Sequence, residues 1–334
     1  MDDGATRLMA DTLQDGLSQL RGRALRIVEL HRSPLERPST FHCERLLVRL
    51  AGGECLPVFF KDLNPQQQAE DARRIRRADI SLSRRELLMY RSILSRERWG
   101  TPQLYGYRWE PSRAILWLFM EDAGRLTLDQ SGDFRQWIEA AKWVARFHTT
   151  VRHFPTSRSG FLPQFDRAHY WNCVKRVQGI LSALNLEDRR FVYQAIEDYI
   201  SLIEWLSGLP RTLIHGELFR HNVVLRPPPA EQLIAVVDWE SAALGPHGLD
   251  LISLTSGMRN AERRRILWRT YFDQYQAGTG LQLEWDAFDR ELSGLALYHA
   301  LSWIARWPGK NFTAQLQGWI GELRSVVTSY FLAG

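Results

Sequence analysis

Two neighbouring stretches decide how this chain folds, 213-LIHGELFRHNVVL-225 and 234-IAVVDWE-240. The first ends in a short apolar run with the composition of a β-strand, at Val223–Leu225, and the second continues such a run, at Leu233–Val237. The segment between the runs carries Arg226 and three prolines, which is typical of a turn. The two stretches therefore predict a hairpin with polar side chains where its strands begin and end.

Three of these polar residues match a phosphoryl-transfer site in residue type and spacing. Glu217 and Asn222 precede the hairpin, and Asp238 follows it. Magnesium prefers oxygen ligands and usually takes one or two carboxylates besides substrate phosphates. We therefore expect Asp238 and Asn222 to hold the metal, and Glu217 to accept the proton of the attacking hydroxyl. The alternative is that these residues only cap turns. The motif with Asp238 follows the first motif after one hairpin, in the order that a nucleotide site requires, and this favours the nucleotide site.

The pair HGELFRHNVVL and VVDWESAALGPHGLDL resembles the aminoglycoside phosphotransferase and choline kinase-like family. The family pattern is His-Gly-Asp-x-x-x-x-Asn followed by Asp-[Trp/Phe]-Glu, so this chain is a divergent member with Glu217 in place of the aspartate. The resemblance implies a two-lobed, protein kinase-like α+β fold, with a small antiparallel β-rich lobe and a larger, mostly helical one. We expect the first lobe to span residues 1–120 and the second to span residues 121–334.

The same resemblance assigns further roles outside the two motifs. Pro57–Lys61 reads as the second strand of a hairpin and ends in the lysine that would neutralise the nucleotide phosphates, with Glu86 as its ion-pair partner. A buried strand ending near Met120, Glu121 and Ala123 would be the hinge that binds adenine through its main chain. The alternative for Lys61 and Glu86 is that they are ordinary surface charges, which are commonplace in proteins.

Further residues receive supporting roles by the same comparison. His215 would hold the catalytic loop by hydrogen bonds, Arg220 would neutralise charge near the γ-phosphate, and Asp250 would brace the loop from within. Between the first two strands, where protein kinases have a glycine-rich loop, Leu30–Phe41 contains no glycine. We expect this segment to be either a loop that holds phosphate oxygens through hydroxyls, main-chain amides and Arg32 or Arg37, or a simple solvated loop.

Composition agrees with a globular enzyme. The 334 residues are 45% hydrophobic, which is enough for two cores. Three cysteines, Cys43, Cys55 and Cys173, have no metal-binding spacing and suit a reducing compartment. With no signal peptide and no apolar run of about 20 residues, we expect a cytoplasmic protein that does not enter a membrane.

Helical periodicity predicts six helices in the C-terminal part, where the acceptor pocket would form. They are expected at Asp133–Thr150, Asp166–Leu184, Asp188–Leu206, Ala261–Gln276, Trp285–Arg306 and Asn311–Phe331.

The formal net charge of +5 is clustered, and such clusters are by default a solvated helical face. A nucleic-acid partner would need phosphate contacts and a recognisable motif, and the chain has no such motif, so we expect none. The basic residues lie at Arg73, Arg74, Arg76, Arg77, Arg84, Arg85 and Arg263–Arg265.

These features together predict an ATP- and Mg²⁺-dependent kinase that phosphorylates a hydroxyl of a small molecule, with GTP as the alternative donor. The acceptor would be a sugar-like or other specialised metabolite, or a serine or threonine of a small peptide. Because Glu217 is one methylene longer than aspartate, the competing hypothesis is a nucleotide-binding pseudokinase that regulates or scaffolds a partner.

Overall fold

The computed structural model describes residues 3–35, 40–70, 73, 79–96, 99–154, 159–228, 230, 232–309 and 313–330. The chain divides into two compact units. Unit 1 contains residues 1–126 and 224–240, and unit 2 contains residues 127–223 and 241–334. The segment that carries Asp238 is thus grouped with the N-terminal unit, and the expected lobe boundary after residue 120 stays a prediction.

Unit 1 is built on a five-stranded antiparallel sheet of order β1-β2-β3-β5-β4. The hairpin predicted around residues 46–61 is confirmed, because β2 and β3 pair throughout their length. The strands are β1 (Ile27–Pro34), β2 (His42–Leu50), β3 (Cys55–Asp62), β4 (Leu104–Glu110) and β5 (Ile115–Glu121).

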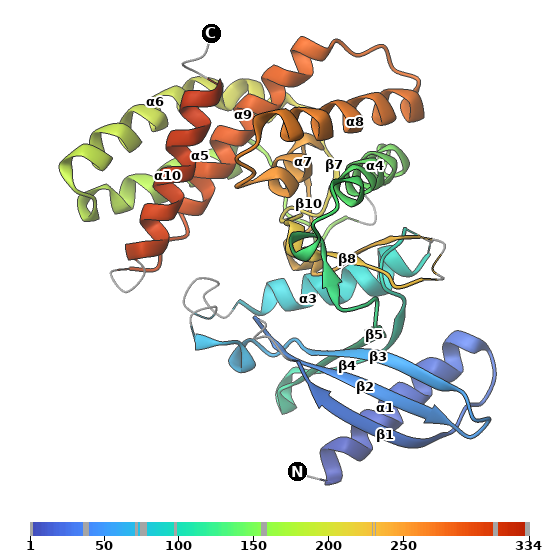
Figure 1. The fold of residues 1–334 in the computed structure, drawn as a ribbon. Helices are drawn as coiled ribbons and strands as arrows, with labels where there is room; N and C mark the ends of the chain where they lie inside the picture. The colour runs from blue at the N-terminus through green and yellow to red at the C-terminus, as the bar shows by residue number, and fades with distance from the viewer. Residues whose placement is uncertain are drawn as a thin grey trace. The chain divides into compact units, whose positions relative to one another are not determined.

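Helix α1 (Asp3–Arg21) packs on this sheet (Figure 1). Met9, Leu13 and Leu17 recur every four residues, so they lie on one stripe of the helix, and all three are buried among strand residues. Burial of each such side chain contributes roughly 1.5–3 kcal/mol. Gly16 allows the helix to approach β4, because a Cβ at this position would lie 2.2 Å from the carbonyl oxygen of Tyr105.

The expected phosphate loop at Leu30–Phe41 is partly wrong. Residues 30–34 belong to β1 and pair with β2, and residues 36–39, including Arg37, lie outside the described residues. Charges of this segment are paired across the strands. Arg32 on β1 forms two hydrogen bonds of 2.6 Å with Glu44 on β2, so its guanidinium is engaged within the sheet.

Helix α3 (Ile80–Leu88) carries Glu86 in unit 1. It starts where the side chain of Asp79 accepts a hydrogen bond from the main-chain N–H of Ser81, at 2.8 Å. Beyond Leu88 the helix continues as a π-helical turn over Met89–Ile93.

Unit 2 is mainly helical, as expected. Asp133, Asp166, Asn185 and Asn260 cap the helices that follow them, which explains why those helices begin within two residues of their predicted starts. The helices are α4 (Phe134–Thr150), α5 (Arg167–Ile180), α6 (Leu186–Gly208), α7 (Gly248–Thr255), α8 (Ala261–Thr279), α9 (Trp285–Ile304) and α10 (Thr313–Tyr330).

Within unit 2, α5, α6, α9 and α10 lie together and α4 packs on α8 (Figure 1). Short strands carry the two sequence motifs. In unit 2, a two-stranded sheet joins β7 (Thr212–Ile214) to β10 (Ala243–Gly245). A three-stranded sheet has the order β6 (Leu126–Thr127), β8 (Val223–Leu225) and β9 (Ile234–Val236), and residues 224–240, which include β9, belong to unit 1. The hairpin predicted at 223–237 is therefore confirmed as β8 and β9.

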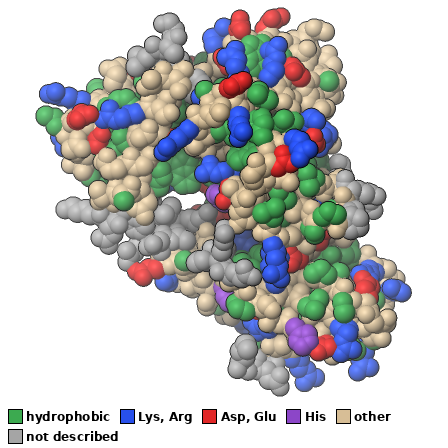
Figure 2. All heavy atoms as spheres, viewed as in Figure 1, with side chains coloured by type: hydrophobic (Ala, Val, Ile, Leu, Met, Phe, Trp, Pro, Cys, Tyr) green, Lys and Arg blue, Asp and Glu red, His purple; other side chains and the backbone are tan. Residues whose placement is uncertain are grey.

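The surface charges do not form a uniform field on the face drawn in Figure 2, where basic and acidic side chains are interspersed. The basic run of α8 is engaged with aromatic rings, since the guanidiniums of Arg263 and Arg265 lie 5.0 Å and 5.7 Å from the rings of Phe134 and Trp285. Arg74, Arg76 and Arg77 lie outside the described residues. Among the described residues, no helix has both the length and the apolar character needed to cross a bilayer.

Candidate functional site

The residues predicted from the sequence fall in both units. In unit 1, Lys61 at the end of β3 meets Glu86 of α3, with Nζ 3.0 Å from Oε1 and 2.8 Å from Oε2. Its ammonium also forms an ion pair with Asp238, which follows β9. The structure thus brings together a lysine and two carboxylates that are 25 and 177 residues away in sequence.

This ionic cluster is largely removed from water. Only 7% of the Lys61 side chain and 1% of the Glu86 side chain are exposed, whereas Asp238 is 26% exposed. Burial disfavours the charged ammonium, but the carboxylates of Asp238 and Glu86 outweigh this cost and raise the pKa of Lys61 above its ordinary value. Lys61 therefore stays a cation at any physiological pH.

Asp238 is held in a conformation that L-residues rarely adopt. Its φ of 68° lies in the left-handed region, which costs energy and is concentrated at functional positions. The carboxylates of Glu86, Asp238 and Glu240 each offer an oxygen, and these oxygens lie within 4.8 Å of one another. Hard carboxylate oxygens fit a magnesium ion, and the partial exposure of Asp238 leaves it accessible to one.

Glu240, two residues beyond Asp238, is 1% exposed. Its main-chain carbonyl accepts a hydrogen bond of 2.9 Å from Arg85, the neighbour of Glu86 on α3. This bond ties the segment after β9 to the helix that carries the partner of Lys61.

The predicted adenine-binding hinge lies at the end of β5. Met120 is buried and pairs with Phe59 and Leu104, which fixes the strand between β3 and β4. The Glu121 N–H donates to the carbonyl of Gln103 at 2.8 Å, and its carboxylate pairs with Arg226, a partner that the sequence did not suggest. Ala123 belongs to a small apolar cluster, described next.

That cluster joins Ala123 to Val224 of β8 and Ala235 of β9, with Val237 packed against it. Gly124 follows at φ 131°, and a Cβ there would lie 2.8 Å from the carbonyl oxygen of Leu225. Only glycine permits this close approach of the two segments.

In unit 2, the loop that carries His215, Glu217 and Asn222 is anchored by Asp250 of α7. The N–H groups of His215 and Gly216 donate to the two oxygens of the Asp250 carboxylate at 2.7 Å and 2.8 Å. Asp250 is 1% exposed, and burial opposes its charge, but the hydrogen bonds from His148 and His215 lower the pKa of its carboxyl. These contacts agree with the bracing role that the resemblance assigned to Asp250.

The brace continues through a chain of buried rings. His148 lies 3.2 Å from Asp250 and 2.9 Å from the Tyr271 hydroxyl, which in turn lies 2.9 Å from Nδ1 of His247. Burial lowers the pKa of His247 to about 3, so this imidazole is neutral near pH 7. His215 itself is fully buried, and the contact found here is that of its main chain.

Gly216 gives the loop its sharp turn. Its φ is 83°, and a Cβ at this position would lie 2.2 Å from the carbonyl oxygen of Ser241. A side chain could not fit there without movement of the main chain.

Glu217 and Asn222 are linked within the loop. The amide Nδ2 of Asn222 donates to the carbonyl oxygen of Glu217 at 3.0 Å, which leaves the Asn222 side-chain oxygen to accept or to ligate. The Glu217 carboxylate forms an ion pair with Arg306, just beyond α9, and only 11% of the Glu217 side chain is exposed. Sequence reasoning missed Arg306, because no local pattern connects residues 89 positions apart.

Arg220 is engaged with the main chain of unit 2. Its guanidinium donates to the carbonyl oxygen of Ser256 at 2.7 Å, within unit 2. Gly257, at φ 71°, passes close to this guanidinium, since a Cβ would lie 3.5 Å from its NH1. The role of Arg220 at a phosphate stays a prediction.

The comparisons with known proteins agree with this geometry. A family model described as "Phosphotransferase enzyme family" matches residues 42–290. No curated protein sequence matches the chain.

Solved structures of low sequence identity share the fold. The GDP complex of aminoglycoside 2'-phosphotransferase-IIIa has a TM-score of 0.58 at 15% identity, over 94% of this chain and 96% of that one. The complex of aminoglycoside phosphotransferase APH(4)-Ia with ADP and hygromycin B has a TM-score of 0.59 at 14% identity, over 95% and 98%. Choline kinase LicA from Streptococcus pneumoniae has a TM-score of 0.54 at 12% identity, over 95% and 99%. The chain therefore has the protein kinase-like fold, with an antiparallel sheet in its N-terminal region and helices in its C-terminal region.

Proposed function

Since this chain belongs to the phosphotransferase enzyme family, we propose that it transfers the γ-phosphate of ATP to a hydroxyl group of a small molecule with the help of Mg²⁺. One observation carries the proposal: the buried Lys61 ammonium joins Glu86 to Asp238, as a site for a metal-bound triphosphate requires. Complexes of similar structures with GDP, ADP and AMP-PNP support a nucleotide donor, with GTP as the alternative.

The residues of unit 1 would bind the nucleotide. Lys61, oriented by Glu86, would neutralise phosphate oxygens. The apolar cluster at Ala123 would form one wall for adenine, beside the main chain of Met120 and Glu121. Asp238 would hold the magnesium together with Asn222 of unit 2, and the metal would neutralise charge on the phosphates.

The residues of unit 2 would act on the acceptor. Glu217 would orient the attacking hydroxyl and take its proton. The acceptor oxygen then forms a bond to the γ-phosphorus, the bond from that phosphorus to the β-γ bridging oxygen breaks, and ADP leaves with the electron pair. Asp250, which holds His215 and Gly216 by their N–H groups, would fix the position of the loop.

Purified protein can test this proposal through nucleotide binding and phosphoryl transfer measured separately. Wild type should bind ATP more tightly with Mg²⁺ than without it, and Asp238→Asn should lose at least roughly tenfold of that affinity because a charged metal ligand is removed. Glu217→Gln should keep binding and lose about 10²–10⁴-fold of the transfer rate. Replacement of the exposed Asp286 by Asn is the matched control. Failure of wild type to bind Mg·ATP would reject the proposal.

A pseudokinase is the second candidate, favoured by one observation. Glu217 stands where the family pattern has aspartate, and its carboxylate is engaged by Arg306. Binding of Mg·ATP with equal, near-zero turnover in wild type and Glu217→Gln would support this candidate over an active kinase.

A further inference from the structure

A cavity of about 360 Å³ opens beside the catalytic loop in unit 2. Phe219 and Arg220 of the loop form one side of it, and α9 and α10 contribute Trp303, Trp319 and Glu322. A volume of this size suits a small organic ligand.

The wall of this cavity is mainly aromatic. The ring of Trp303 lies 5.4 Å from that of Phe219 and 5.9 Å from that of Trp319, at interplanar angles of 58° and 42°. All three side chains are half-buried, so each presents part of its ring to the cavity. Aromatic faces of this kind stack on flat apolar groups.

The charges of the wall cancel. Arg220 and Glu322 are its charged residues among those described, and each is engaged with the main chain. His221, whose ring stacks on that of Phe219, also lines the cavity. Arg220 donates to the carbonyl oxygen of Ser256 at 2.7 Å, and Glu322 accepts from the N–H of Gly257 at 3.1 Å. His299, beneath Trp303, is neutral near pH 7 because burial lowers its pKa to about 4. A polycation would therefore find no excess of negative charge in this cavity.

The cavity is connected to the residue that would take the proton. The guanidinium of Arg306 forms the ion pair with Glu217 and also lies 4.5 Å from the centre of the Trp303 ring. A ligand that stacks on Trp303 would thus reach the neighbourhood of the Glu217 carboxylate.

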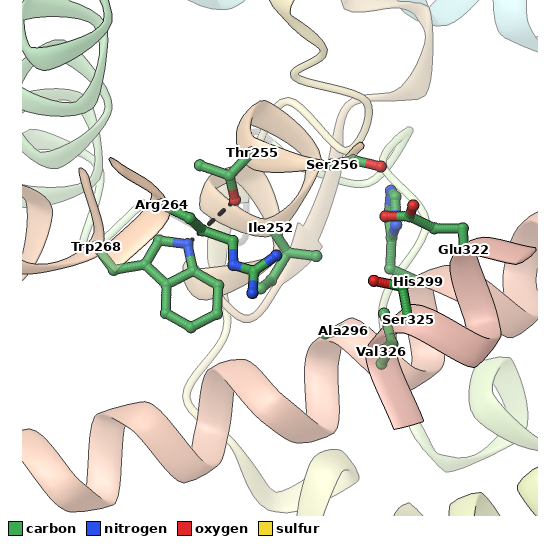
Figure 3. A pocket seen from close by; sticks show the side chains of 10 residues that line it. All are labelled: Ile252, Thr255, Ser256, Arg264, Trp268, Ala296, His299, Glu322, Ser325 and Val326. Atoms are coloured by element: carbon green, nitrogen blue, oxygen red, sulfur yellow. Dashed lines mark hydrogen bonds between the residues drawn. The ribbon is translucent and has the colours of Figure 1, made fainter. Parts of the chain in front are cut away.

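A second pocket adjoins this cavity and shares Ser256 and Glu322 with it (Figure 3). Its volume of about 30 Å³ has room for little more than one water molecule. Trp268 closes it on the α8 side, where its indole N–H donates to the Thr255 hydroxyl at 3.1 Å. Of these two pockets, the larger one has room for an acceptor.

We infer that the larger cavity binds the acceptor, and that this acceptor is an uncharged, hydroxylated molecule with one flat apolar face, such as the C–H face of a sugar ring or an aromatic ring. The inference rests on the proposed phosphotransferase function and names its substrate class. It separates this chain from the similar structures solved with the polycationic ligands kanamycin and hygromycin B.

The affinity of chosen probes, measured by calorimetry without nucleotide, tests the cavity by itself. Phenyl β-glucoside should bind at least roughly tenfold more tightly than kanamycin, because stacking is kept and no charge must be neutralised. Methyl β-glucoside and benzyl alcohol separate the two kinds of flat face, since each carries only one of them.

Variants of one tryptophan locate the binding. Trp319→Ala should weaken the binding of phenyl β-glucoside about 3- to 10-fold, and Trp319→Phe should weaken it less because a ring remains. Trp205 on α6 is 42% exposed and lines neither pocket, so Trp205→Ala is the matched control and should leave the affinity unchanged.

Three results would overturn the inference: no saturable binding of any neutral probe, kanamycin bound as tightly as phenyl β-glucoside, or equal effects of Trp319→Ala and Trp205→Ala. Phosphorylation of kanamycin by Mg·ATP with all neutral probes left unmodified would overturn it as well. Failure to bind Mg·ATP is a different result, because it rejects the proposed function without changing the nucleotide-free affinities.

Discussion

The guanidinium of Arg306 forms an ion pair with the carboxylate of Glu217. Glutamate has one more rotatable bond than the aspartate of the family pattern, so a fixed partner restricts where its carboxylate can lie. We therefore expect Arg306 to position Glu217. Arg306→Met should lower the rate constant of phosphoryl transfer about 10- to 100-fold, since misplacement by about 1 Å can cost 10²-fold, with little change in the KM for ATP.

Arg324 of α10 offers a close control for this prediction. It also pairs with carboxylates, those of Glu187 and Asp188, and its guanidinium lies 4.4 Å from the ring of Phe191. Arg324→Met should leave the transfer rate unchanged, and Arg306→Lys should recover part of the activity lost in Arg306→Met. If Arg306→Met and Arg324→Met retained equal kcat values, the positioning role would be wrong.

The buried pair of Lys61 and Glu86 predicts a non-additive loss of stability. Lys61→Met would leave the Glu86 carboxylate, 1% exposed, without its cation and close to Asp238, so the free energy of unfolding should fall by about 3–5 kcal/mol. The double variant Lys61→Met, Glu86→Met should be more stable than the single variant, because it removes the uncompensated charge. Chemical denaturation of wild type, Lys61→Met, Glu86→Met and the double variant measures the coupling.

Arg32 and Glu44 provide the comparison within the same unit. Their side chains are 21% and 9% exposed, so this pair is better solvated than that of Lys61 and Glu86. Arg32→Met should therefore cost less than Lys61→Met. Equal losses for the two variants would mean that the burial of the Lys61 cluster does not govern its energetics.

The elements that the sequence predicted are those whose signals are local. Asp133 and Asp166 start helices because their side chains accept hydrogen bonds from N–H groups two or three residues ahead, and this pattern is visible in sequence. The strand at Ile27–Pro34 was missed because its charged residues, such as Arg32, look like those of a loop until their partners on β2 are known.

The candidate site was predictable to the extent that its residues lie in motifs. His215, Glu217, Asn222 and Asp238 come from two short stretches, and the Lys61–Glu86 pair was found where the family resemblance placed it. The partners that set their chemistry were not predictable. Arg306 meets Glu217, and Arg226 meets Glu121, through tertiary folding alone, and lone arginines carry no signal of such contacts.

The brace formed by Asp250 predicts a pH-dependent loss of stability. The pKa of this carboxyl is lowered in the folded protein. Its ionised form therefore stabilises the folded protein above the unfolded pKa of about 3.9, and this stabilisation is lost as the pH falls through the pKa of the folded protein. Asp250→Asn should reduce the free energy of unfolding by roughly 2–4 kcal/mol at pH 7, because charge-assisted bonds to His215 and Gly216 are weakened. The difference between wild type and variant should shrink below about pH 4.

Asp273 of α8 serves as the control for this measurement. Its side chain is 64% exposed and lies 3.5 Å from Arg269, so Asp273→Asn should change the stability by no more than about 0.5 kcal/mol. A difference between wild type and Asp250→Asn that stays constant down to pH 3 would contradict the assignment of a lowered pKa.

Glu291 of α9 predicts the opposite dependence on pH. Burial raises the pKa of its carboxyl from an ordinary value near 4.5 to about 7, so the folded protein holds this proton more tightly than the unfolded chain. The contribution of this protonated carboxyl to the free energy of unfolding is therefore complete below about pH 4.5 and is lost as the pH rises to about 7. The loss in free energy of unfolding is on the order of 3 kcal/mol. Glu291→Gln cannot ionise, so it should resemble wild type near pH 5 and be the more stable protein at pH 8. Urea unfolding at the two pH values measures the difference in stability between Glu291→Gln and wild type, and the exposed Glu197→Gln is the control. A difference that does not depend on pH would show that the Glu291 carboxyl keeps its ordinary ionisation.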